Sequence, residues 1–120
     1  MIDATLVRAC VVACATLVAV PASAATIYDG SWALTIRTTR GACDPTYNFQ
    51  VNIRNGMIFH PNLVRLRGRV TGKGAVRVSV AVPGKFAAGS GRMTRNAGRG
   101  RWSGHSDNAR CSGSWTAQRY

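Results

Sequence analysis

The amino-acid sequence predicts an all-β fold: a small antiparallel meander closed into a barrel of about eight short strands, after a cleaved N-terminal signal peptide. Three observations predict it. Apolar and polar residues alternate along most of the chain after residue 25, turn residues separate the alternating segments, and a Gly-x-Trp motif occurs three times. A chain of 120 residues has room for one such domain.

Residues 1–24 have the pattern of a secretory signal peptide. Arg8 precedes an apolar run, residues 9–20, and Ala22-Ser23-Ala24 supplies the small residues of a cleavage site. The run is too short to cross a bilayer. We therefore expect a single mature domain, residues 25–120, that is exported to the periplasm or secreted and has no transmembrane segment.

Period-two alternation defines the expected strands. Six segments place apolar residues or glycine on one face and polar or cationic residues on the other, namely 32–37, 47–54, 64–70, 75–82, 99–104 and 111–118. Residues 57–60 form a marginal strand. Residues 85–93 (KFAAGSGRM) have no regular phase, so we expect a bulge or bend there, at Gly89 or Gly91.

Turn signals fall between these segments. Asn55-Gly56 is the strongest short hairpin dipeptide in the sequence. Three further turns are expected at 72–74 (GKG), 83–84 (PG) and 96–98 (NAG).

The Gly-x-Trp motif suggests how the sheet closes. Trp32, Trp102 and Trp115 are expected core aromatics, and the glycine two residues before each one lies on the same inward face. A glycine there leaves space for the indole and permits the sharp bending that a small barrel requires.

Two cysteines remain after cleavage, Cys43 and Cys111, and an even pair in an exported protein predicts a disulfide. In an even-stranded meander the first and last strands meet. Cys43 follows the first strand and Cys111 begins the last, so the bond would join the barrel seam. The parity of Cys43 is wrong for the inward face of the first strand, which places it in the turn or beyond a bulge.

Charge is the most unusual property of the composition. Residues 25–120 contain 15 basic and three acidic residues, a net charge of +12, without any glutamate. Such a positive field attracts polyanions. Outside the cytosol these include lipopolysaccharide phosphates, acidic glycans and other anionic polymers or lipid head groups.

Arginines recur at period two and predict an anion-binding face. Arg65, Arg67 and Arg69 would leave one side of one strand, and the loop at 72–74 would set Arg77 opposite Arg69. Arg99 and Arg101 form a second outward pair. Guanidinium groups suit bidentate contacts with phosphate or carboxylate. The alternative is a cationic face that is merely solvated.

Catalytic and metal-binding chemistry has little support. Asp29, Asp44 and Asp107 all fall near turns, and no cysteine or histidine spacing matches a zinc site. His60 and His105 are expected in loops, and a ribonuclease-like use of them would need a geometry that the sequence does not indicate. We therefore expect no enzyme activity, metal or cofactor.

The strings YDGSWALTIRTTRGACDPTYNFQVNIRNG, HPNLVRLRGRV and RWSGHSDNARCSGSWTAQRY resemble a set of small exported alphaproteobacterial proteins of unassigned function. The likeness covers essentially the whole mature chain but implies no activity. More loosely, a Gly-x-Trp opening strand before a small meander is similar to calycin-type barrels, which are lipocalins, avidins and periplasmic metalloprotease inhibitors.

The sequence thus favours a non-enzymatic exported protein that binds anionic envelope or extracellular material through outer arginines. A calycin-type inhibitor of an extracellular protease is the alternative, with residues 25–29 as a substrate mimic. A purely structural envelope protein is a third possibility.

Overall fold

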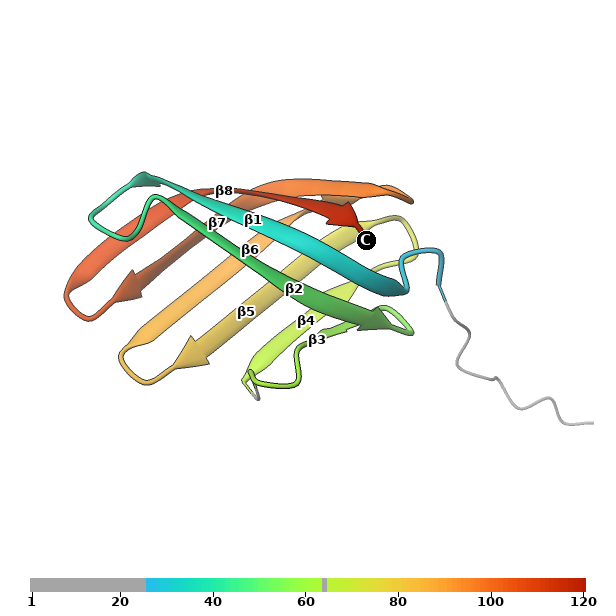
Figure 1. Cartoon of the computed structure of the whole chain (residues 1–120), viewed down its shortest axis with the longest axis horizontal. Coiled ribbons are helices and arrows are strands. Elements are labelled where there is room, and N and C mark those ends of the chain that lie inside the picture. The colour runs from blue at the N-terminus through green and yellow to red at the C-terminus, as the bar shows by residue number, and fades with distance from the viewer. Residues whose placement is uncertain (1–25, 64) are drawn as a thin grey trace, which may run out of the picture.

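The computed structural model describes residues 26–63 and 65–120, in which eight antiparallel strands close into a barrel (Figure 1). This confirms the predicted fold class. The proposed signal peptide lies outside the described residues. The strands are β1 (Gly30–Arg40), β2 (Thr46–Arg54), β3 (Met57–Phe59), β4 (Leu66–Val70), β5 (Ala75–Val82), β6 (Lys85–Met93), β7 (Ala97–Ser106) and β8 (Ala109–Arg119).

The topology is a simple meander in which each strand pairs with the next and β8 returns to pair with β1. The wall is least complete around β3 and β4. Only Asn52–Arg54 of β2 pair with β3, and only Met57 and Ile58 of β3 pair with β4. The first half of β2 therefore pairs with β1 alone, and this side of the barrel has an opening.

The hairpin turns follow the expected chemistry. Asn55 and Gly56 have φ values of 53° and 77°, the left-handed pair that a two-residue type I′ turn requires, and Arg54 pairs with Met57 across them. Pro83-Gly84 joins β5 to β6 in a second two-residue turn, in which Gly84 has a φ of 77°. The turn expected at 96–98 begins slightly earlier. It starts at Thr94, whose N–H donates a hydrogen bond to the Ala97 carbonyl.

Three strand assignments need correction. Residues 85–93 form a regular strand whose register with β5 and β7 is unbroken, so the expected bulge is absent from β6. β4 begins at Leu66, with Arg65 in the turn before it, and β3 ends at Phe59, one residue before His60. Gly89 and Gly91 are therefore small inward positions in an unbroken ladder.

One end of the barrel, the closed end, is filled by side chains and by the segment before β1. Trp32 is fully buried there, and its indole N–H donates to the Tyr28 carbonyl at 2.8 Å. Arg119 lies over the Trp32 ring at 4.7 Å and donates to the carbonyl of Asp29 at 2.6 Å. These contacts hold residues 26–29 against the barrel.

The predicted core tryptophans all point inward. The glycine of a Gly-x-Trp motif, however, does not make room for the tryptophan of the same motif, as was expected. Trp32 and Trp115 are buried, and Trp102 is half-buried and donates its indole N–H to the Arg37 carbonyl at 3.0 Å. A Cβ on Gly100 would meet the ring of Trp115, which lies on the neighbouring strand. The glycine thus makes room across the sheet and not for the tryptophan of its own motif.

The predicted disulfide joins Cys43, in the turn between β1 and β2, to Cys111 in β8, with 6.1 Å between their Cα atoms. Because Cys43 lies in the turn and not in β1, the inward–outward alternation of that strand does not apply to it. The bond fixes the β1–β2 turn to the last strand at the end of the barrel opposite Trp32, which we call the open end.

The pH dependence of stability offers a test of the closed end. Burial raises the pKa of Asp29, but hydrogen bonds from the Thr26 hydroxyl and from the N–H groups of Asn55, Gly56 and Thr26 outweigh it and lower the pKa below its ordinary value of 3.8. A lowered pKa stabilises the fold fully above the unfolded-state pKa, and this stabilisation is lost as the pH falls below that value and through the lower folded-state pKa.

We therefore expect Asp29→Asn to destabilise the protein at neutral pH, and the difference from wild type to shrink as the pH falls below about 4. Urea denaturation between pH 7 and pH 2.5 would measure it. Asp44→Asn, in an exposed loop, is the matched control. A constant difference across that range would mean that the Asp29 carboxylate does not contribute as the contacts indicate.

Candidate anion-binding surface

Most of the predicted anion-binding arginines leave the outer face of three strands and are exposed. Arg67 and Arg69 lie on β4, Arg77 on β5, and Arg99 and Arg101 on β7. Arg65 is also exposed but lies in the turn before β4, so it is not part of the ladder that its spacing predicted.

The register between β4 and β5 sets Arg69 directly opposite Arg77, as the length of the connecting loop predicted. From there a single line of outward residues crosses the sheet, because Arg77 pairs with Ser90, Ser90 with Arg101, Arg101 with Ser114 and Ser114 with Arg37. We call this line the arginine row, and its members in order are Arg69, Arg77, Ser90, Arg101, Ser114 and Arg37.

The arginine row extends around the barrel wall, perpendicular to the strands. Neighbouring strands are about 4.8 Å apart, so the five steps from Arg69 to Arg37 cover roughly 24 Å. Four guanidinium groups share that length, with a serine hydroxyl at each position between them from Arg77 onward. This spacing suits an extended anion with several charges better than a single small ion.

Two parallel lines of residues add cations on each side of the row. Toward the closed end, Arg92 of β6 faces Arg99 of β7. Toward the open end, the line that starts at Arg67 continues through Ser79, Ala88, Ser103 and Ser112 to Arg40. The residues between these two arginines are serines and an alanine, whose short side chains project little from the outer wall.

Shallow depressions lie on both sides of Arg101. One is bordered by Arg77, Arg92 and Arg99, and the other by Arg40 and by serines of β7 and β8. Both contain Ser90 and Ser114. Hydroxyl donors and forked guanidinium groups therefore face the same hollows, a combination suited to sulfate, phosphate or carboxylate oxygens.

The acidic residues do not neutralise this face. Within the described part of the chain, Asp29, Asp44 and Asp107 all lie outside the strands, and Asp29 accepts hydrogen bonds from the β2–β3 turn. Arginines that face each other across a ladder, such as Arg69 with Arg77 and Arg92 with Arg99, repel. An anion placed between them would remove that repulsion.

The two histidines make separate local contacts. His60 accepts a hydrogen bond at Nδ1 from the N–H of Asn62, and His105 stacks on Phe86 with 6.1 Å between the ring centres. In residues 26–63 and 65–120, no three histidine, cysteine, aspartate or glutamate side chains gather as metal ligands. In the same ranges no helix is long and apolar enough to cross a membrane.

Sequence reasoning missed Arg37, Ser90 and Ser114, and it treated Arg99 with Arg101 as a patch separate from Arg77. The register shows that Arg77 and Arg101 are two strands apart in one row. The closure of β8 onto β1 was predicted, but the register that sets Arg37 opposite Ser114 was not.

Comparison with known proteins identifies no relative. No family model matches the chain, and neither a curated protein nor a solved structure is similar to it. The eight-stranded antiparallel barrel and its surface are therefore the basis for any statement about function.

Proposed function

We propose that the protein is an exported, non-enzymatic binder of extended polyanions, such as acidic glycans or the phosphates of lipopolysaccharide, and that the arginine row is its binding surface. The observation that carries the proposal is the alignment of Arg69, Arg77, Arg101 and Arg37 along one line of the outer wall. The disulfide is consistent with export, since such bonds persist in oxidising compartments.

The alternative of a calycin-type protease inhibitor is less favoured by the placement of its expected reactive segment. Residues 26–29 are held by Trp32 and Arg119, and Tyr28 is only 5% exposed. A segment that mimics an extended substrate has to enter the cleft of a protease, which these contacts oppose. The resemblance to exported alphaproteobacterial proteins is compatible with either function.

A double substitution in the middle of the row tests the proposal. We expect Arg77→Gln with Arg101→Gln to weaken binding to heparin and to lipopolysaccharide, and to lower the slope of log affinity against log salt by about two, since each cation that contacts the polymer contributes about one. Isothermal titration calorimetry at several salt concentrations measures both quantities.

The matched control is Arg95→Gln with Arg110→Gln, an equal loss of charge at exposed positions outside the row. Equal losses of affinity in the two double variants would show that diffuse charge and no specific row is responsible. If neither variant loses affinity, anion binding is wrong, and inhibition of a panel of extracellular proteases becomes the next measurement.

A further inference from the structure

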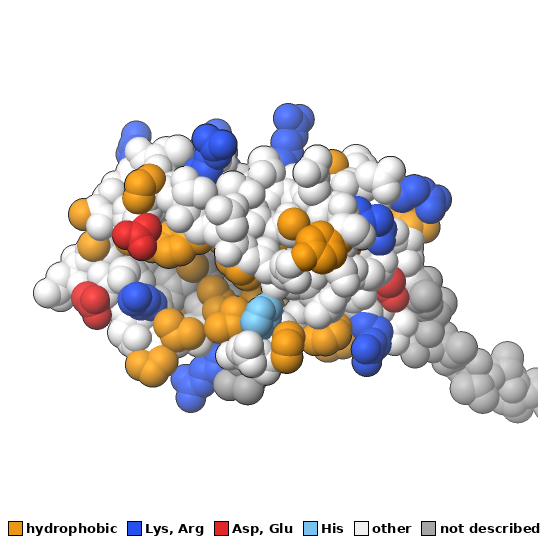
Figure 2. Space-filling model, in the orientation of Figure 1, with side chains coloured by type: hydrophobic (Ala, Val, Ile, Leu, Met, Phe, Trp, Pro, Cys, Tyr) orange, Lys and Arg blue, Asp and Glu red, His pale blue; other side chains and the backbone are white. Residues whose placement is uncertain are grey.

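The interior of the barrel is empty toward the open end. A cavity of about 250 Å³ opens there, on the side where β3 and β4 leave the wall incomplete. Figure 2 shows hydrophobic side chains gathered in a hollow on this face of the molecule. The cavity is lined by inward residues of seven strands, among them Ile36, Phe49, Leu66, Val80, Trp102 and Trp115.

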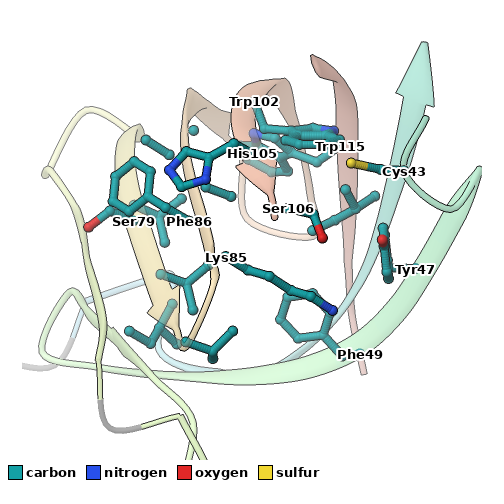
Figure 3. Close-up of a pocket in the computed structure, with 18 residues that line it drawn as sticks. Cys43, Tyr47, Phe49, Ser79, Lys85, Phe86, Trp102, His105, Ser106 and Trp115 are labelled. Atoms are coloured by element: carbon teal, nitrogen blue, oxygen red, sulfur yellow. The ribbon is translucent and has the colours of Figure 1, made fainter. Parts of the chain in front are cut away.

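A cation stands at the mouth of this apolar cavity. Lys85 pairs with Val82 and Ser106, which places it on the inward face of β6, and Figure 3 shows its side chain pointing into the cavity. The other inward cation among the described strands, Arg119, lies at the closed end and already donates to the carbonyls of Asp29, Ile27 and Arg95. Lys85 thus provides a charge where a bound molecule would leave the cavity.

Exposed apolar side chains at the rim also favour an apolar occupant. Tyr47 and Val82 lie on inward faces, are 40% and 39% exposed, and border the cavity. Apolar side chains at this exposure lose contact with water when a chain of methylene groups covers them, which is favourable. Clefts that are mostly apolar, with a few polar groups at one end, are the usual form of a small-molecule site.

We propose that this cavity binds an aliphatic carboxylate with a single chain, whose hydrocarbon part enters the barrel and whose carboxylate pairs with the Lys85 ammonium. A methylene group occupies about as much space as a water molecule in the liquid, roughly 30 Å³, so the cavity accommodates about eight carbons. The site is distinct from the arginine row, which lies on the outside of the same wall, and it does not depend on polyanion binding.

Chain length and head group provide the first test, with sodium hexanoate, octanoate and dodecanoate as probes in calorimetry. Affinity should rise about fourfold for each added methylene and level off beyond about eight carbons, because each buried methylene contributes a fixed increment until the cavity is full. Octyltrimethylammonium should bind more weakly than octanoate. Equal binding of the two, or no dependence on chain length, would overturn the proposal.

Two single variants locate the site. Lys85→Gln should weaken octanoate binding by up to about fivefold, the effect of one partly exposed ion pair, and leave binding of octanol unchanged. Val82→Trp should block the mouth and abolish binding of both, and because Val82 is 39% exposed at the rim the variant should still fold. Gln118→Trp, an outward and exposed position of β8, is the matched control and should bind octanoate normally.

The row variant Arg77→Gln with Arg101→Gln separates this site from the proposed function, since it should bind octanoate as wild type does. Loss of octanoate binding in that variant, or normal binding in Val82→Trp, would place the ligand on the outer face and refute the cavity site.

Discussion

Loss of the Cys43–Cys111 bond should lower the free energy of unfolding by about 2–5 kcal/mol, the usual range for a small secreted domain. The two cysteines are 68 residues apart, so the bond shortens a long loop of the unfolded chain. A domain of this size has a total stability of about 5–15 kcal/mol, which makes the loss a large share of it. Urea denaturation of the oxidised protein and of the Cys43→Ser, Cys111→Ser variant measures the difference.

The position of the bond makes the effect local as well as global. The Cα atoms are 6.1 Å apart, within the range that a disulfide spans without moving the backbone. Without it, the β1–β2 turn is released from β8, and hydrogen exchange should rise first in residues 37–46. Ready alkylation of both cysteines in native, unreduced protein, or equal stability of the double serine variant, would contradict this assignment.

The strands that sequence predicted best are those in which side-chain size contrasts strongly between the two faces. Val76, Val78, Val80 and Val82 alternate with small or charged residues, and β5 extends over that segment with the inward valines facing the barrel interior. β6 lacks such contrast, since its middle has small residues on both faces, alanine and glycine inward and alanine and serine outward. Its straight register is fixed by the neighbouring β5 and β7 and not by its own pattern.

The arginine row was only partly predictable because it depends on several registers at once. One hairpin loop was enough to place Arg77 opposite Arg69. Extending the line to Arg37 requires the β5–β6, β6–β7, β7–β8 and β8–β1 registers, and one residue of error in any of them moves the line to the other face.

The cavity left no sequence signal of its own. It opens where β3 and β4 are short. The inward position of Lys85 was also hidden, because β6 shows no regular alternation and its register comes from its neighbours. The length of a strand near a loop depends on where pairing with the neighbouring strand begins and ends. The local alternation of apolar and polar residues does not predict these points. Arg65 shows the same limit: its spacing continues that of Arg67, but the chain joins the sheet only at Leu66.

Gly100→Ala should strongly destabilise the barrel, because the added methyl group has no room in the wall. A Cβ at Gly100 would lie 2.6 Å from the Cε2 and Nε1 atoms of Trp115 and still closer to the Ser90 carbonyl oxygen. Trp115 is 6% exposed, and its indole N–H donates to that carbonyl at 3.2 Å, so the ring has little freedom to move. Overpacking of this kind costs about 1–3 kcal/mol, and we expect the upper end.

Gly72→Ala is the control, because no atom lies within 4 Å of its added Cβ and its unfolding free energy should change by less than about 0.5 kcal/mol. The origin of the cost can be isolated with Trp115→Phe, whose smaller ring frees space beside Gly100. In that background Gly100→Ala should be less damaging by about 0.5–3 kcal/mol, the coupling expected of two groups in contact. Additive effects in urea denaturation would assign the cost to the Ser90 carbonyl alone. A Gly100→Ala variant as stable as Gly72→Ala would show that the glycines do not make room for the indole.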